Sequence, residues 1–220
     1  VLEDVDIRVT SDSSAGGGGI NAVHLSSTDN TTEIRGRVVR NLTVRGKLTN
    51  AGLQPQWRAL SIGATGYLSV EDFTADYCNV GLYSTYADQY VAVTRAKIRE
   101  AVTAVSIGGP VENFLFRDCL FETGTCLIGD GSDTIARIKI LNCQFLMCTP
   151  TISGSTVSDV SFCDSYIRGN GSATQAGLDV AASSRIEDFY VKRNKFLNIQ
   201  NATTPNVFTL RLVSPRVDEV

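Results

Sequence analysis

The sequence predicts an all-β solenoid, a single-stranded right-handed parallel β-helix of about eight coils. A phrase of alternating apolar residues recurs along the chain, a second short apolar segment follows it, and no helical period separates the two. The phrase starts at Leu2, Val39, Val70, Asp88, Val111, Ile135, Val157 and Ile186. Because one copy cannot bury its apolar face alone, the copies are expected to stack on one another.

The third and fifth residues after each start are apolar, whereas the residue between them is mixed. The third position holds Val5, Leu42, Phe73, Val91, Phe114, Ile138, Val160 and Phe189. This period-two alternation, rich in β-branched and aromatic residues, is typical of a strand with one buried face. Strands that recur at intervals of 18 to 37 residues favour a parallel sheet with about 4.8 Å between neighbours.

The second apolar segment ends in Gly or another small residue, as in Ala59–Gly63 and Thr125–Gly129, which predicts a strand closed by a turn. A leucine-rich-repeat solenoid is the alternative fold, because its signature fits Ile186 to Phe196 with Asn194 at the Asn position. Val, Ile and Phe outnumber Leu in the repeated columns, and strand-like segments stand where that fold needs a helix. The β-helix is therefore favoured.

The composition bounds the domain organisation and the partners. With 220 residues and 43% hydrophobic content, residues 1–220 can form one β-helix domain. The chain begins with Val1 already in the repeat, so we expect a fragment of a longer chain. A net charge of −3 argues against nucleic acid as the main partner, and no apolar run has the length of a membrane span, so membrane insertion is not expected.

The six cysteines are expected to be free thiols. Cys78, Cys119 and Cys143 all stand eight residues after a predicted start, which indicates a small inward-facing position where Cys behaves as a modest hydrophobe. Free buried thiols favour assembly in a reducing cytoplasm.

The seventh position after the start contains the candidate catalytic residues, because its residue types are irregular and polar. It holds Tyr77, Arg95, Asp118, Asn142, Asp164 and Arg193. Asp118 and Asp164 are predicted two coils apart, about 9.6 Å, which overlaps the carboxyl separation of inverting glycosidases. In this hypothesis Arg95 and Asn142 hold sugar hydroxyls or a uronate. The alternative is a solvated turn column in which acids and arginines compensate one another.

Aromatic residues concentrate in the third and fourth predicted coils, where five of the seven tyrosines lie. Trp57, Tyr77 and Tyr83 are candidates for stacking on sugar rings, since their amphipathic rings suit that contact. Alternatively, the tyrosines are ordinary exposed strand residues and Trp57 caps the interior of a coil. His24 is the only histidine, so ligands for a zinc site are scarce, and we expect neither a metal nor a cofactor.

Phrases such as Ile135-Ala-Arg-Ile-Lys-Ile-Leu-Asn-Cys-Gln-Phe145 resemble the pectin-lyase-like right-handed parallel β-helix superfamily. Free cysteines, Gly/Ser/Asn-rich turns and loops of uneven length make the chain most similar to the β-helix domain of a bacteriophage tailspike or tail fibre. That resemblance implies a homotrimer in the virion tail, assembled in the host cytoplasm, that binds a bacterial surface polysaccharide and often hydrolyses it. No catalytic residue carries over from the resemblance.

Two other functions stay open. One is a non-catalytic structural or adhesin-like binding module, and the other is a monomeric secreted polysaccharide lyase or hydrolase.

Overall fold

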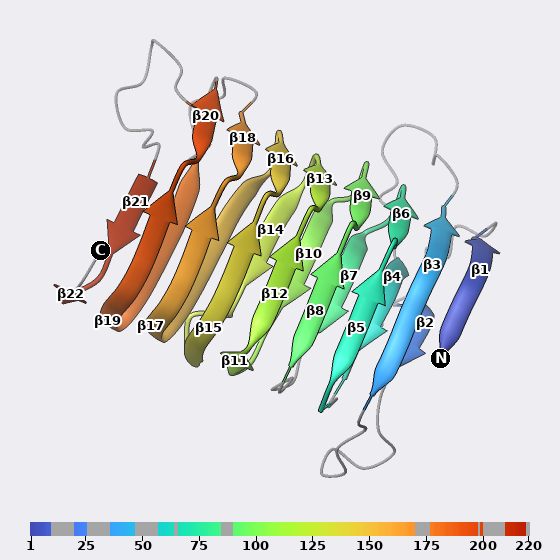
Figure 1. The fold of residues 1–220 in the computed structure, drawn as a ribbon, viewed down its shortest axis with the longest axis horizontal. Coiled ribbons are helices and arrows are strands. Elements are labelled where there is room, and N and C mark those ends of the chain that lie inside the picture. Colours follow the sequence, from blue (N-terminus) through green and yellow to red (C-terminus); the bar gives the residue numbers. More distant parts are fainter. Residues whose placement is uncertain are drawn as a thin grey trace.

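The computed structural model describes residues 1–9, 20–25, 36–46, 57–63, 66–84, 90–169, 177–197, 199 and 210–218. None of these residues lies in a helix, and 22 strands join into one sheet with parallel pairings throughout. This part of the chain is a right-handed parallel β-helix solenoid, as predicted (Figure 1). A leucine-rich repeat is excluded for it, because that fold needs a helical or 3₁₀ side.

The coil has three faces, which we call the long wall, the short wall and the back wall. The long wall contains β5 (Leu68–Glu71), β8 (Val91–Thr94), β11 (Val111–Glu112), β12 (Phe114–Arg117), β15 (Thr134–Leu141) and β22 (Val217–Asp218). It also contains the first halves of β1 (Leu2–Arg8) and β3 (Arg37–Arg45), whose second halves continue into the short wall. The short wall contains β6 (Thr74–Asp76), β9 (Lys97–Arg99), β13 (Leu120–Glu122), β16 (Gln144–Leu146), β18 (Tyr166–Arg168) and β20 (Lys195–Leu197). The back wall contains β2 (Ile20–Leu25), β4 (Trp57–Ile62), β7 (Val80–Ser84), β10 (Thr103–Ile107), β14 (Thr125–Ile128) and β21 (Leu210–Val213).

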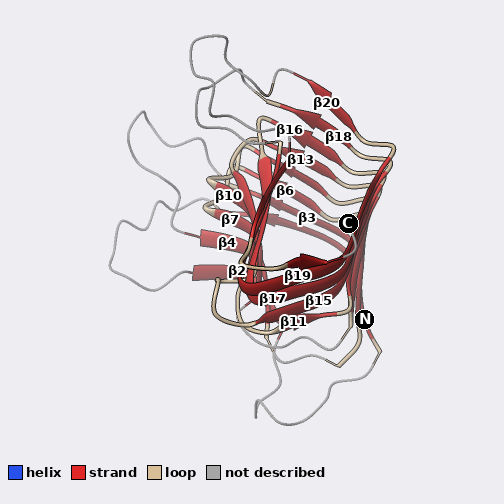
Figure 2. Cartoon of the chain, turned by 90° about the vertical axis from the view of Figure 1, so that its left-hand side faces the viewer, coloured by secondary structure: helices blue, strands red, loops and turns tan. Residues whose placement is uncertain are grey.

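Two long strands, β17 (Thr149–Cys163) and β19 (Leu178–Lys192), run from the back wall into the long wall. Each strand pairs with its equivalents in the coils before and after it, so that Val91 lies between Leu68 and Phe114. Viewed end-on, the three walls surround a common interior (Figure 2). The outer surface of a wall is therefore a stack of equivalent positions, one for each coil.

The first three coils are shifted by five residues from the predicted register. Val39 pairs with Val70, and Val70 pairs with Val93, the fifth residue after the start at Asp88. Val39 and Val70 are therefore also fifth residues after a start, although the sequence predicted them as starts. The predicted interval of 18 residues between the third and fourth coils becomes 23, the separation of the neighbours Asp72 and Arg95. This correction changes which side chains share a column.

The interior is filled mainly by branched aliphatic and aromatic side chains. Phe116, Phe121, Phe145 and Phe162 are at most 1% exposed, and the centroids of successive rings lie 5.8, 5.1 and 5.7 Å apart. In the corrected register, the third position of the second coil holds Arg37, which pairs with Leu68. The expectation that this column is apolar throughout was therefore wrong for that coil.

The coil bends at residues with a left-handed backbone. Within the described ranges, sixteen non-glycine residues have φ between 48° and 68°, a conformation that costs an ordinary L-residue about 1–2 kcal/mol. Nine of them are Asp or Asn, which tolerate this conformation better than other residues. Asn113, Asp118 and Thr123 mark three such bends within one coil, at intervals of five residues.

All six cysteines are free, and five of them are buried. Cys119 and Cys143 occupy one inward column, in which Ser165 and Asn194 follow. Each of these four side chains donates to a backbone carbonyl of its own or the preceding coil, and Ser165 accepts from the backbone N–H of Cys143 at 3.1 Å. The thiols therefore satisfy backbone groups at a bend, which is more than the hydrophobic role predicted for them.

Cys78 lies outside that column, because the corrected register moves it one bend further along the coil. It stands directly after the left-handed residue Tyr77 and is fully buried. Burial raises the pKa of the Cys78 thiol to about 12 and that of Cys148 to about 12. Both thiols therefore stay protonated and unreactive at neutral pH.

Candidate functional site

A column of polar residues follows the bend between the long wall and the short wall. We call it the polar ladder: Asp4, Asn41, Asp72, Arg95, Asp118, Asn142, Asp164 and Arg193. All eight residues have a left-handed backbone, which explains why Asp and Asn recur there. Asp occupies alternate coils, and Asn or Arg occupies the coils between. The ladder thus places one planar polar group on each coil.

The residues of the polar ladder are hydrogen-bonded in pairs. Arg95 donates two hydrogen bonds of 2.8 Å to Asp72, and Arg193 donates two of 2.6 and 2.7 Å to Asp164. The amide of Asn142 donates to Asp118 at 2.6 Å. The fork of an Arg and both oxygens of a carboxylate fit one another in such bidentate pairs. Each side chain is therefore held in one orientation by its neighbour.

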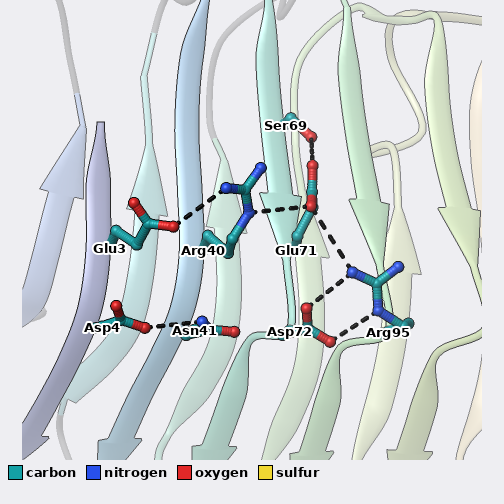
Figure 3. A network of polar contacts seen from close by, with 8 residues as sticks. All are labelled: Glu3, Asp4, Arg40, Asn41, Ser69, Glu71, Asp72 and Arg95. Atoms are coloured by element: carbon teal, nitrogen blue, oxygen red, sulfur yellow. Dashed lines mark hydrogen bonds and ion pairs between the residues drawn. The ribbon is translucent and has the colours of Figure 1, made fainter.

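A second polar row runs beside the ladder over its first three coils (Figure 3). Arg40 on β3 contacts Glu3 on β1 at 3.1 Å and Glu71 on β5 at 3.3 Å. Glu71 also lies 3.7 Å from Arg95, which joins the second row to the ladder. This end of the long wall is thus a continuous network of charges on four neighbouring strands.

Charge pairing sets the protonation state of two acids in the ladder. The hydrogen bonds from Arg95 lower the pKa of Asp72, and those from Arg193 lower the pKa of Asp164. A lowered pKa keeps a carboxylate ionised at acidic pH values where an ordinary Asp begins to take up a proton. Both side chains are 41% exposed, so the pairs contribute little to stability and lie open to an external ligand.

The structure brings together four of the predicted site residues. Asp118 and Asp164 occupy the same column two coils apart, about 9.6 Å by strand spacing. Asn142 lies between them, and Arg95 lies one coil before Asp118. This is the separation that led us to predict an inverting glycosidase from the sequence. The pKa of Asp164 is lowered, however, whereas a general acid needs a raised one, so Asp164 does not suit the role of the acid.

The structure places the predicted aromatic residues elsewhere. Trp57 is 5% exposed, and a side chain at Gly46 would collide with its ring. Trp57 therefore packs in the interior and offers no face to a sugar, which corrects the prediction for this residue. Tyr77 belongs to the next bend and not to the ladder, because Asp72 takes the position predicted for it.

Tyr83 lies on the back wall, away from the ladder. The guanidinium carbon of Arg58 lies 3.5 Å from the centroid of its ring, a cation–π contact that covers one face. Tyr83 therefore cannot contribute to one binding surface with Asp118 and Asp164, as the prediction required. Arg95 and Asn142 are the predicted glycan contacts that do lie beside the two acids.

A pair of exposed tyrosines at the opposite edge of the long wall was missed as a site. Tyr67 and Tyr90 are 52% and 45% exposed, and their ring centroids lie 5.6 Å apart at an interplanar angle of 35°. The two residues precede β5 and β8 directly and occupy the same position in neighbouring coils. The interval of 23 residues between them could have indicated that they share a column, but the sequence predicted an interval of 18 residues between these two coils.

Polar side chains continue the column that the tyrosine pair begins. Asn113 and Arg137 follow in the next two coils, and Arg137 donates to Asn113 at 2.7 Å. Arg137 also forms an ion pair with Glu112. This edge of the long wall therefore combines two aromatic rings with an amide, a guanidinium and a carboxylate.

Neither a metal site nor a membrane span is found within the described ranges. No group of three His, Cys, Asp or Glu side chains is arranged there to hold a metal ion. No helix among these residues is long and apolar enough to cross a lipid bilayer. Comparisons with protein-family models, with curated proteins and with solved structures found no match.

Proposed function

We propose that the long wall binds a bacterial surface polysaccharide and that the chain is a tailspike-type β-helix domain of a phage tail. The polar ladder is the single observation that carries this proposal. It presents one exposed, planar hydrogen-bonding group on every coil, at a repeat of about 4.8 Å. A polysaccharide is likewise a repeating array of hydroxyl groups, so a regular wall can contact several successive units in the same way.

The fixed orientation of the ladder supports binding over a passive surface. A side chain that is already held by its neighbour loses little conformational freedom when a ligand arrives, and this loss is a main cost of association. Carboxylate oxygens accept hydrogen bonds, and guanidinium groups donate them. The ladder therefore offers alternating acceptors and donors, which suit hydroxyl groups that can do both.

Loss of one ladder arginine is the direct test of binding. Arg95→Ala removes the donor between Asp72 and Asp118 and is expected to weaken binding of the matching polysaccharide roughly tenfold, as for a charged hydrogen bond worth about 1.5 kcal/mol. Co-sedimentation of the full-length protein with capsular polysaccharides and lipopolysaccharides measures the affinity. Arg211→Ala is the matched control, because Arg211 forms a bidentate pair with Asp179 on the back wall. Equal affinity in both variants would reject the ladder as the binding surface.

Hydrolysis of the bound glycan is the second candidate function, and the spacing of Asp118 and Asp164 favours it. Asp164, which the hydrogen bonds from Arg193 keep ionised, would accept a proton from the attacking water, and Asp118 would protonate the leaving oxygen. Asp118→Asn is expected to lower the release of new reducing ends by about 10²–10⁴-fold, with affinity and thermal stability nearly unchanged. Asp164→Asn should act similarly, whereas the back-wall control Asp179→Asn should not.

Reducing-end release separates a depolymerase from a structural or adhesin-like module. Wild-type turnover in both Asp118→Asn and Asp164→Asn would end the hydrolytic proposal. Binding without any release of reducing ends would identify a binding module. Analytical ultracentrifugation of the same samples tests the proposed homotrimer against the monomer expected of a secreted lyase or hydrolase.

A further inference from the structure

We infer that Tyr67 and Tyr90 form a stacking platform for an uncharged sugar ring of the bound glycan. This inference rests on the proposed function and deepens it. It assigns a second contact region, at the edge of the long wall opposite the polar ladder. It also assigns a chemical class to the sugar that binds there.

The geometry of the tyrosine pair supports a platform. About half of each side chain is open to water, although Tyr is an amphipathic residue that gains by covering its ring. The rings support each other at 5.6 Å, and both are attached next to strands that the parallel sheet fixes in position. The exposed parts of the two rings form one apolar patch for the C–H face of a sugar ring, which leaves the sugar hydroxyls free for hydrogen bonds.

The size of the patch argues against a protein partner. A Tyr side chain buries about 150–250 Å² when fully covered, so two half-exposed rings offer on the order of 200 Å². A specific protein interface needs roughly 1,000 Å² or more. A single sugar ring, in contrast, is of the same size as the pair.

Polar groups lie where the hydroxyls of the next sugar would fall. Asn113 and Arg137 are one and two coils beyond Tyr90, at steps of about 4.8 Å. Arg137 is oriented by Asn113 and Glu112, as the ladder residues are oriented by each other. A glycan that stacks on the tyrosines and continues along this edge therefore meets donors and acceptors.

The charge of this edge indicates an uncharged sugar. Three of its arginines each form an ion pair with an acid: Arg137 with Glu112, Arg185 with Glu187, and Arg216 with Asp218. Arg37, which pairs with Leu68 beside Tyr67, adds one positive charge. Asp159 and Asp188 add two further negative charges at the same column position as Arg137. The net charge is therefore negative, which repels a uronate or another acidic sugar.

Tyrosine nitration with peptide mass spectrometry tests the platform directly. The probes are short fragments of dextran, mannan and galactan as neutral sugars, and oligogalacturonate as the acidic one. At least one neutral fragment is expected to protect Tyr67 and Tyr90 of the full-length protein. Tyr166 on β18 should stay reactive, because it is partly exposed and lies on the short wall, outside the proposed binding surface. Protection by oligogalacturonate alone would overturn the assignment of an uncharged sugar.

Variants separate this inference from the proposed function. Tyr67→Ala and Tyr90→Ala are each expected to weaken binding of the protecting glycan about tenfold. The ring-preserving changes Tyr67→Phe and Tyr90→Phe, and the control Tyr166→Ala on the short wall, should stay within about threefold. If Arg95→Ala weakens binding and both Tyr→Ala changes do not, the platform is wrong and the wall still binds. If no polysaccharide binds to the wild-type protein, both proposals fall.

Discussion

Phe145→Ala is expected to lower the free energy of unfolding by about 3–5 kcal/mol. Phe145 is fully buried, and its ring stacks on Phe121 on one side and Phe162 on the other, with centroids 5.1 and 5.7 Å away. The neighbouring coils are fixed by parallel pairing on three walls, so the cavity can collapse only partly. Denaturant unfolding, followed by circular dichroism, measures the change.

Phe196→Ala is the matched control for that substitution. Phe196 occupies the same inward column two coils later, but its side chain is only partly buried. Phe196→Ala is therefore expected to lower the free energy of unfolding clearly less than Phe145→Ala does. Equal losses at both positions would show that the aromatic stack has no special role in the middle of the solenoid.

Gly129→Ala is expected to cost about 2–5 kcal/mol, the second-largest effect on stability. Gly129 directly follows β14 and has a φ of 85°, and an added Cβ would lie 2.1 Å from the carbonyl oxygen of Ser153 in the next coil. The left-handed backbone accounts for about 1–2 kcal/mol, and the collision accounts for about 1–3 kcal/mol more. The shift in the denaturant midpoint at constant slope measures the sum.

Gly131→Ala measures the cost of the left-handed backbone separately from the cost of the collision. Gly131 has a φ of 93°, but its added Cβ would meet only the Ser153 hydroxyl oxygen at 3.4 Å. Gly131→Ala is therefore expected to cost about 1–2 kcal/mol. A loss as large as that of Gly129→Ala would assign the whole effect to backbone strain and none to the close approach of the two coils.

The sequence was sufficient to predict the fold and the registers of the later coils, because period-two alternation and recurrence follow directly from strand geometry. It was insufficient for the first three coils for a specific reason. Left-handed bends recur every five residues, as at Asn113, Asp118 and Thr123, and inward residues follow each bend in the same pattern. A shift of five residues therefore superposes one bend on the next, and apolarity alone cannot distinguish the two registers.

The same ambiguity limited the prediction of the site. Asp118, Asn142 and Asp164 lie in clear repeats, and they were correctly predicted to share a column with Arg95. Asp72 and Tyr67 lie in the shifted coils, so the partner of Arg95 and half of the tyrosine pair were missed. The burial of Trp57 depends on packing against Gly46 across the interior of the same coil, a contact that no local pattern of the sequence indicates.

The alternation of charge along the polar ladder sets a rule for how such a solenoid can change in length. Deletion of the single coil that carries Arg95 would place Asp72 in the coil next to Asp118. The two carboxylates would then lie one strand spacing apart and repel each other. Deletion or duplication of two successive coils preserves the sequence of acid and partner. The unit that can be added or removed without pairing two acids is therefore two coils. Tandem duplications that lengthen the solenoid are expected to copy an even number of coils.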